Sequence, residues 1–305
     1  MGKLILGCMN FGRRTPAAEA ERVLTAAVDA GVTHIDTANV YADGESERIV
    51  GDTLRGRVVT LTTKVGLARA GRAWEGLHPD TVRAACDNSL RRLRREQVDV
   101  YLLHAPDPLT APEATLEAIA GLLYTGKIAA WGVSNFAAWQ VLELITLADR
   151  AGMPRPCVGQ QLYNVLVRQL ELEYFAFARR YAVATNVYNP LAGGLLALAP
   201  TGPVPTGARF QKNPLYQRRY ATPTMVGAAA GLNSIATRAG LTLLELAYAF
   251  VFQRPEVQGV VVGPATEAHL VAALAAASAV APTEALAAVE AWSLARAGTD
   301  ATYAR

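Results

Sequence analysis

Four side chains with complementary chemistry lie at or near the ends of short apolar runs in this chain. Asp36, Lys64 and His104 each end such a run, and Tyr41 follows shortly after Asp36. An ammonium group near a tyrosine favours the phenolate and so lowers the phenol pKa from its usual value of about 10. The tyrosine then becomes a better proton donor near neutral pH, and a neutral imidazole can orient a substrate oxygen. Such a set suits carbonyl reduction, in which a hydride goes to carbon and a proton to oxygen.

Each of these residues also has a purely structural interpretation. Asp36 could cap the loop after its strand, Lys64 could extend to solvent, and His104 could lie in a turn with Pro106. These interpretations are weaker when taken jointly, because a buried charge needs a partner. Asp36 and Lys64 end neighbouring apolar runs, so each can be the partner of the other.

The apolar runs alternate with amphipathic segments that are typical of helices. Strands are predicted at residues 3–7, 33–36, 58–64, 98–103, 128–133, 157–160, 183–188 and 259–262. Helices are predicted at residues 17–30, 46–55, 78–93, 112–124, 137–150, 169–181, 226–239 and 242–253, with two alanine-rich helices closing the chain. Such alternation implies a parallel sheet. Eight repeats favour an α/β fold with a closed (β/α)8 TIM barrel over an open sheet.

In such a barrel the carboxyl ends of the strands share one rim, where barrel enzymes place their chemistry. Ser134 and Asn135 follow the fifth predicted strand, Gln160 ends the sixth and Tyr188 ends the seventh. We therefore expect these residues to join the first four in one pocket. The segment 192–225 after the seventh strand is predicted to be a long loop, and loops of that length in compact domains are usually functional.

The composition is that of a globular domain. Of 305 residues, 51% are hydrophobic and 18% charged, and the net charge is +3. Because no linker divides the chain, we interpret residues 1–305 as one domain. The densest basic run, residues 91–95, ends a predicted helix, where cations are favoured, so no nucleic-acid partner is expected.

Neither a membrane span nor a metal site is expected. No stretch approaches the roughly 18 uninterrupted apolar residues that a span requires. Cys8, Cys86 and Cys157 match no metal motif and are interpreted as reduced thiols, so we expect a cytoplasmic protein. The sequence also has no GxGxxG after a strand, so a Rossmann dinucleotide site is absent.

Several motifs, in order, resemble those of the aldo-keto reductases. HIDTANVYADGESERIVG resembles the family signature, TLTTKVG the lysine strand, YLLHAPDP the histidine strand and GVSNF the segment that binds the nicotinamide carboxamide. MNFGRR, GQQLYNVLVRQLELE, VYNPLAGGLL and GARFQKNPLYQRRY are similar to the branch that contains aflatoxin-aldehyde and succinic-semialdehyde reductases. The resemblance covers nearly the whole chain.

The resemblance implies an NADPH-dependent reductase of aldehydes or ketones. It makes Asp36, Tyr41, Lys64 and His104 the catalytic tetrad, with Tyr41 as general acid. Residues expected to contact the nicotinamide are Ser134, Asn135 and Gln160 at the carboxamide and Tyr188 on the ring. Other expected cofactor contacts are Pro190, Leu191, Gly193, Arg209, Arg219, Gly263, Thr266 and His269.

The phosphate end of the expected cofactor site departs from the family pattern. Many members carry Lys or Arg after the eighth strand to hold the 2′-phosphate, whereas residues 263–269 contain neither. His269 falls near the place of a phosphate-binding arginine, and Ala273 replaces an asparagine that usually contacts adenine. Basic residues of the long loop could supply the missing charge, namely Arg209, Lys212, Arg218 and Arg219. NADPH is therefore the expected cofactor, with NADH as the alternative.

The substrate pocket is expected to include Met9 and Phe11 after the first strand, with Cys8 beside them, and Trp74 as another wall. Arg305, or Arg209, could bind a substrate carboxylate, whereas Trp139 is expected to be a packing residue.

Two other functions share these motifs. A ketoreductase of secondary metabolism would differ only in its pocket. A cofactor-binding regulatory subunit, such as the potassium-channel β subunits, would be indicated by an eroded tetrad or an added N-terminal segment, and neither is seen here. By resemblance to the branch, a homodimer is also expected.

Overall fold

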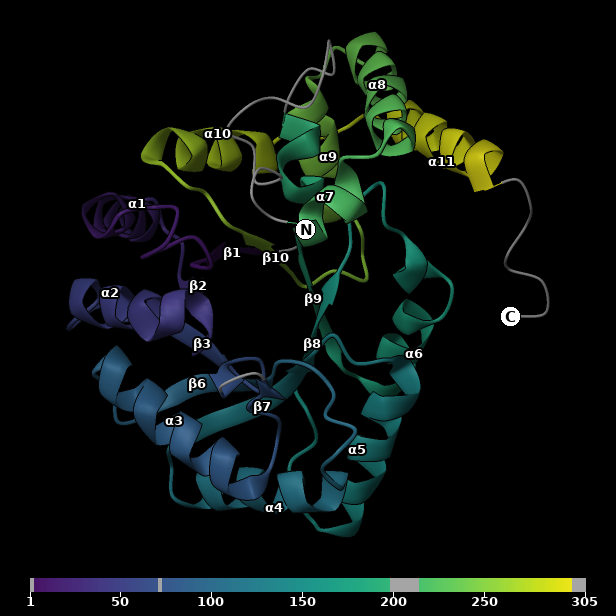
Figure 1. Ribbon diagram of the computed structural model, residues 1–305. Helices are drawn as coiled ribbons and strands as arrows, with labels where there is room; N and C mark the ends of the chain where they lie inside the picture. Colours follow the sequence, from purple (N-terminus) through teal and green to yellow (C-terminus); the bar gives the residue numbers. More distant parts are fainter. Residues whose placement is uncertain (1–2, 71–72, 198–213, 298–305) are drawn as a thin grey trace.

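Eight parallel strands close into a barrel in the computed structural model, which describes residues 3–70, 73–197 and 214–297 (Figure 1). Around the barrel the strand order is β1, β10, β9, β8, β7, β6, β3, β2. The barrel strands are β1 (Lys3–Gly7), β2 (His34–Asp36), β3 (Thr60–Val65), β6 (Val98–Leu103), β7 (Ile128–Ser134), β8 (Val158–Leu162), β9 (Ala184–Tyr188) and β10 (Gly259–Val262). The predicted (β/α)8 barrel is confirmed.

Helices surround the barrel and cover its outer face (Figure 1). Those that precede β9 are α1 (Ala17–Asp29), α2 (Glu45–Thr53), α3 (Pro79–Leu93), α4 (Pro112–Tyr124), α5 (Ala138–Arg150) and α6 (Tyr174–Tyr181). Those that follow it are α7 (Pro214–Tyr220), α8 (Pro223–Arg238), α9 (Leu243–Phe252), α10 (Glu267–Ala277) and the additional C-terminal helix α11 (Thr283–Ala297). Short 3₁₀ turns lie at η1 (Tyr41–Gly44), η2 (Gln169–Glu171) and η3 (Ala192–Ala197).

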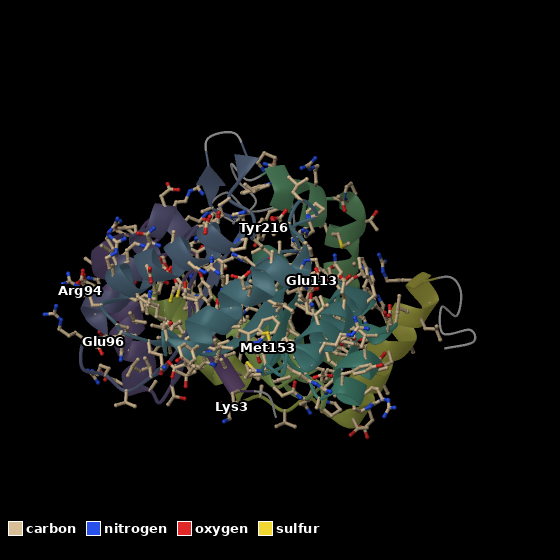
Figure 2. All side chains as sticks on the ribbon, turned by 90° about the horizontal axis from the view of Figure 1, so that it is seen from below. Lys3, Arg94, Glu96, Glu113, Met153 and Tyr216 are labelled. Carbon is tan, nitrogen blue, oxygen red and sulfur yellow. The ribbon has the colours of Figure 1, made fainter. Side chains whose placement is uncertain are left out.

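The strand register brings the polar strand ends to one rim. Gly7 of β1 lies opposite Asp36 of β2, and Ser134 of β7 lies opposite Gln160 of β8. Figure 2, in which the molecule is seen from below, shows Lys3 at the amino end of β1 and Tyr216 of α7 toward the opposite rim. Helix α7 therefore lies on the side of the barrel where the strands end.

The buried carboxylate of Glu47 joins α2 to β3 and to α3. Glu47 of α2 is fully buried, accepts a hydrogen bond from Thr63 at 2.5 Å and pairs with Arg92 of α3 at 2.6 Å. At Gly51 a Cβ atom would lie 2.5 Å from the carbonyl oxygen of Arg92, so only glycine permits this approach of α2 to α3. The hydroxyl of Thr63 on β3 is thus paired with a carboxylate from the helix layer outside the barrel.

The prediction of one continuous loop over 192–225 is wrong. Residues 214–220 form α7, and α8 already begins at Pro223. Tyr216 and Tyr220, spaced four residues apart, are buried on one face of α7, so their burial stabilises a helix that the Arg- and Tyr-rich composition had suggested to be a loop. Residues 198–213 lie outside the described part of the chain.

Two smaller differences concern local structure. The helix predicted over 169–181 is divided into η2 and α6. A hairpin of β4 (Arg69–Ala70) and β5 (Ala73–Trp74), which the sequence did not predict, follows β3.

Within the described residues, no single helix is both long and apolar enough to cross a membrane. Helices α8 and α9 reach this length and hydrophobicity only when they are taken together, and a bend of 90° separates them.

Candidate active site

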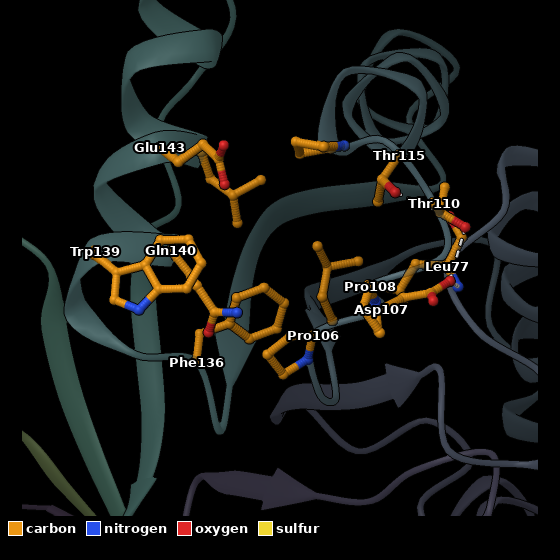
Figure 3. Close-up of a pocket in the computed structure, with 13 residues that line it drawn as sticks. Leu77, Pro106, Asp107, Pro108, Thr110, Thr115, Phe136, Trp139, Gln140 and Glu143 are labelled. Carbon is orange, nitrogen blue, oxygen red and sulfur yellow. Dashed lines mark hydrogen bonds between the residues drawn. The ribbon is translucent and has the colours of Figure 1, made fainter.

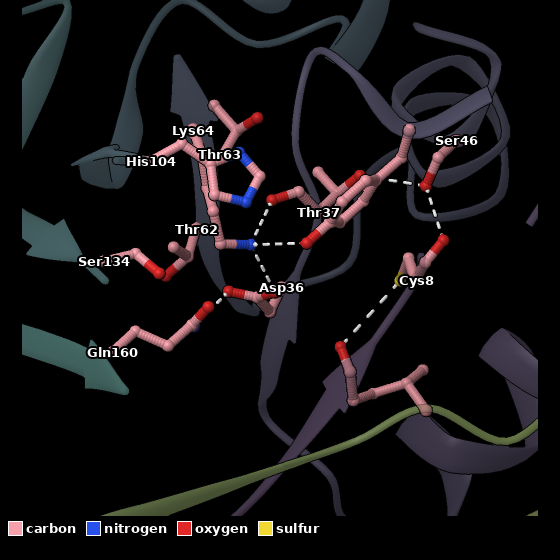
Figure 4. A network of polar contacts seen from close by, with 12 residues as sticks. Cys8, Asp36, Thr37, Ser46, Thr62, Thr63, Lys64, His104, Ser134 and Gln160 are labelled. Atoms are coloured by element: carbon pink, nitrogen blue, oxygen red, sulfur yellow. Dashed lines mark hydrogen bonds and ion pairs between the residues drawn. The ribbon is translucent and has the colours of Figure 1, made fainter. Parts of the chain in front are cut away.

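A buried ion pair lies at the carboxyl end of β2 and β3. Lys64 Nζ donates hydrogen bonds to Asp36 Oδ1 at 2.5 Å and to the carbonyl oxygen of Thr37 at 2.7 Å. Neither side chain of the pair is more than 2% exposed. Gln160, from the far side of the barrel, donates to the other carboxylate oxygen of Asp36 at 2.7 Å (Figure 4). The structure therefore gives both buried charges the partners that they require.

The hydroxyl of Tyr41 is the third group within reach of the Lys64 ammonium. The distance from Lys64 Nζ to the Tyr41 hydroxyl oxygen is 3.4 Å, and Nζ lies 5.0 Å from the centre of the phenol ring. Tyr41 begins η1, in which Ala42 and Asp43 have φ of 49° and 55° and turn the chain into α2. Ser46 secures this turn by donating to the carbonyl oxygen of Cys8 at 2.9 Å. The phenol is thus directed at the buried ammonium.

His104 completes the group from the end of β6. Its ring centre lies 5.8 Å from that of Tyr41 in an edge-to-face arrangement. The imidazole is 7% exposed, and its Nδ1 has no hydrogen-bond partner among the described residues. Burial, with a smaller contribution from the Lys64 charge, holds the pKa of His104 well below its usual value. The imidazole is therefore neutral at neutral pH.

This lowered pKa predicts a loss of stability in acid. Below the unfolded-state pKa of about 6.5 the unfolded chain binds a proton at His104 that the folded chain does not bind. The contribution of His104 to the free energy of unfolding is fully present above that pH. Below it the contribution falls by up to about 1.4 kcal/mol per pH unit, until the pKa of His104 in the folded protein is reached. Urea unfolding of wild type and His104→Gln between pH 8 and 5 measures this difference. Parallel pH profiles would contradict it.

The residues expected at the nicotinamide carboxamide gather beside His104. Asn135 Nδ2 donates to the His104 carbonyl oxygen at 2.9 Å and to Ser134 Oγ at 3.1 Å, while Tyr188 donates its hydroxyl hydrogen to Asn135 Oδ1 at 2.7 Å. Asn135 has φ of 65°, a conformation that asparagine tolerates better than most residues. Ser134 Oγ accepts in this contact, and among the described residues no acceptor takes its hydroxyl hydrogen. These groups, together with the unpartnered His104 Nδ1, fit a carboxamide and a carbonyl oxygen as ligands.

The turn after β9 depends on Asn189, a residue that the sequence analysis did not single out. Its Oδ1 accepts from the Gly193 N–H at 2.6 Å, and its Nδ2 donates to the Tyr220 hydroxyl of α7 at 2.8 Å. Burial raises the pKa of the neighbouring Tyr188 phenol, and the positive charge of Arg219 opposes this. Pro190, Leu191 and Gly193 lie in the same turn. Because Tyr220 contacts Asn189 and Arg219 lies near Tyr188, helix α7 packs on the expected nicotinamide site. Arg209 and Lys212 lie outside the described residues.

Comparison with known proteins places the chain in a family. A family model described as the Aldo/keto reductase family matches residues 3–293. The chain belongs to the aldo/keto reductase family. This family comprises oxidoreductases that act on carbonyl compounds and generally bind nicotinamide cofactors, so the coarse class of the expected activity is supported.

Individual relatives agree with the expected branch. Aflatoxin B1 aldehyde reductase member 4 of Homo sapiens is 42% identical over 194 residues, which cover 63% of this chain and 58% of that protein. Aflatoxin B1 aldehyde reductase member 2 of Mus musculus is 40% identical over 194 residues, covering 63% and 53%. The chain thus aligns with little more than half the length of these reductases. A probable voltage-gated potassium channel subunit beta of Oryza sativa subsp. japonica is 32% identical over 274 residues, covering 86% and 83%.

The residues expected on the substrate side differ widely in exposure. Met9 is 37% exposed and Trp74 of the hairpin is 54% exposed. Phe11, which the sequence predicts to line the pocket, is fully buried in the hydrophobic core. Cys8 is also fully buried, and burial raises the pKa of its thiol. Arg305 lies outside the described residues.

Glu75 fastens the hairpin to the tetrad, a role that no sequence motif indicated. Its Oε1 accepts from Asn39 Nδ2 at 2.8 Å and from the backbone N–H groups of Gly66 at 2.7 Å and Ala68 at 3.2 Å. Asn39 lies two residues before Tyr41, and its own N–H donates to the carbonyl oxygen of Lys64 at 3.2 Å. The carboxylate therefore joins the turn that carries Tyr41 to the loop after β3.

A cavity of about 250 Å³ lies between α4 and α5, beside the site and not within it (Figure 3). Its lining includes Leu103, Phe136 and Trp139, and none of the tetrad. Trp139, which the sequence predicts to be a packing residue, is 64% exposed on α5 and borders this cavity.

The phosphate end of the expected cofactor site does not fit as well as the nicotinamide end. Asn10 and Thr15 donate to the carbonyl oxygens of Gly263 and Ala265 at 3.1 and 3.0 Å, and Thr266 Oγ1 accepts from the His269 N–H at 3.2 Å. Thr266 therefore serves as the N-cap of α10. His269 is exposed, and the segment 263–269 offers no Lys or Arg to a 2′-phosphate. In the part of the chain that the structure describes, no group of three or more His, Cys, Asp or Glu side chains could hold a metal ion.

Proposed function

We propose that this chain reduces aldehydes or ketones to alcohols with NADPH, with Tyr41 as the general acid. The observation that carries the proposal is the buried Lys64 ammonium, which contacts both the Asp36 carboxylate at 2.5 Å and the Tyr41 hydroxyl at 3.4 Å. A buried ion pair adds little net stability compared with apolar side chains of similar volume, so stability alone does not explain this pair. Its arrangement supports proton donation from Tyr41.

The chemistry of the proton follows from these contacts. An ammonium carries three hydrogens, and the three acceptors around Lys64 Nζ are Asp36, the Thr37 carbonyl and Tyr41. Asp36 and Thr37 hold the ammonium in place, and the ammonium stabilises the negative charge that develops on the Tyr41 oxygen as its proton leaves. Neutral His104 can donate one N–H to the carbonyl oxygen and so keep it beside the phenol.

The cofactor supplies the hydride when it is bound. Ser134, Asn135 and Gln160 are the residues proposed to hold its carboxamide, with the ring of Tyr188 against the nicotinamide. Pro190, Leu191, Gly193, Arg219, Gly263, Thr266 and His269 are proposed as further contacts. A small carbonyl compound is the proposed partner, bordered by Met9 and Trp74, and a cytoplasmic homodimer is proposed from the resemblance.

Steady-state assays test this proposal directly. Purified protein should oxidise NADPH in the presence of succinic semialdehyde, 2-carboxybenzaldehyde and a panel of ketones, as followed by the absorbance of the reduced nicotinamide. Activity on aldehydes is expected to exceed activity on ketones. Turnover of a single complex ketone alone would favour the pathway-specific ketoreductase. Tight nucleotide binding without turnover of any carbonyl would favour the regulatory subunit, to which the channel-subunit relative also points.

A further inference from the structure

The first turn of α10 binds a carboxylate from the chain itself. Helices α1 and α10 lie side by side (Figure 1). Oε1 of Glu19, in the first turn of α1, accepts a hydrogen bond from the backbone N–H of Glu267, the first residue of α10, at 3.0 Å. The Glu19 side chain is 21% exposed and also pairs with Arg22. A negative charge is therefore held at the amino end of α10.

This end of the barrel is where a dinucleotide's phosphates would be sought on physical grounds. Phosphate sites in (β/α)8 barrels are frequently formed by the loops after the seventh and eighth strands, together with a short additional helix. Here these strands are β9 and β10, and the first helix after β10 is α10. Free N–H groups and the helix dipole would favour an anion there. In this chain the N–H of Glu267 is taken by Glu19, and that of His269 by Thr266.

We propose that Glu19 is a specificity-determining residue that opposes the 2′-phosphate of NADPH, so that the chain binds NADH about as well as NADPH. The inference rests on the proposed function, since it concerns the cofactor of the same site. NADPH differs from NADH by one phosphate group of charge near −2. Within a Debye length of about 10 Å at 0.1 M salt, a carboxylate repels that group. Glu19 also neutralises the nearest cation on its own helix, because it pairs with Arg22.

The matched substitutions are Glu19→Gln and Glu21→Gln. The glutamine side chain in the first variant retains an amide oxygen that can accept the Glu267 N–H, so the contact between α1 and α10 can persist while the charge is lost. Glu21 lies on the same helix, is exposed and provides the same change of charge, but among the described residues it makes no hydrogen bond to α10. Dissociation constants of NADPH and NADH are measured by quenching of protein fluorescence, which requires no turnover.

In the wild-type protein the two dissociation constants are expected to agree within about threefold. Glu19→Gln should tighten NADPH about two- to fivefold, an effect of the size seen for charges at helix ends, and leave NADH unchanged. The gain should shrink in 1 M salt, where the Debye length is about 3 Å. Glu21→Gln should tighten NADPH less than Glu19→Gln does, because the carboxylate of Glu21 is not hydrogen-bonded to α10.

Two outcomes would overturn the inference. The first is a wild-type preference for NADPH above about a hundredfold, which is measured without any variant and would mean that other residues bind the 2′-phosphate. The second is an equal response of Glu19→Gln and Glu21→Gln. In both cases the proposed reductase would stand, because nucleotide still binds. Failure of the wild-type protein to bind either nucleotide would instead remove both proposals.

Discussion

Tyr41→Phe should lower kcat for aldehyde reduction by about 10²–10⁴, the usual contribution of one general acid. The substitution removes only the hydroxyl that lies 3.4 Å from Lys64 Nζ and retains the ring that packs against His104. Binding of NADPH should therefore change little. Steady-state kinetics give kcat, and fluorescence titration gives the dissociation constant of the nucleotide.

Tyr124→Phe is the matched control, because the Tyr124 side chain is 93% exposed on α4 and distant from the tetrad. It should retain wild-type kcat. If Tyr41→Phe turned over aldehydes as fast as this control, Tyr41 would not be the proton donor.

Lys64→Met should abolish measurable turnover and also destabilise the fold by about 3–5 kcal/mol. The reason is that Asp36, 2% exposed, would remain as a buried carboxylate whose cation is gone, and among the described residues the Gln160 amide would be its remaining side-chain donor. Urea unfolding at neutral pH measures the free energy of unfolding, and the same preparation gives kcat.

Lys127→Met provides the comparison. Lys127 pairs with Asp87 at the same Nζ–oxygen distance of 2.5 Å, yet the two side chains are 39% and 45% exposed. An exposed pair contributes at most about 1 kcal/mol, so this variant should unfold almost as wild type. Equal losses of stability in the two variants would refute the distinction between the buried and the exposed pair.

The barrel was predictable because its signal is local and repeated. Each strand is a short apolar run, each helix has its own amphipathic pattern, and the polar residue that ends a strand marks the rim. The closed strand order then requires Asp36, Lys64 and His104 to share that rim, as the structure shows.

Side-chain direction was less predictable. Phe11 follows β1 just as Met9 does, but Phe11 is fully buried while Met9 is 37% exposed. A loop has no fixed alternation of faces, so the sequence could not distinguish the two. Helix α7 was missed for a related reason, because burial of Tyr216 and Tyr220 against other segments, and not local propensity, stabilises it.

By itself the sequence determined the fold class, the order of the elements and the identity of the residues at the strand ends, since these follow from patterns within about thirty residues of one another. Tertiary structure decided which of these groups touch. Gln160 reaches Asp36 across 124 residues of chain, and Glu19 reaches Glu267 across 248. Such contacts exist only once the barrel has closed, because closure brings together strands and helices that have no local relation in the sequence.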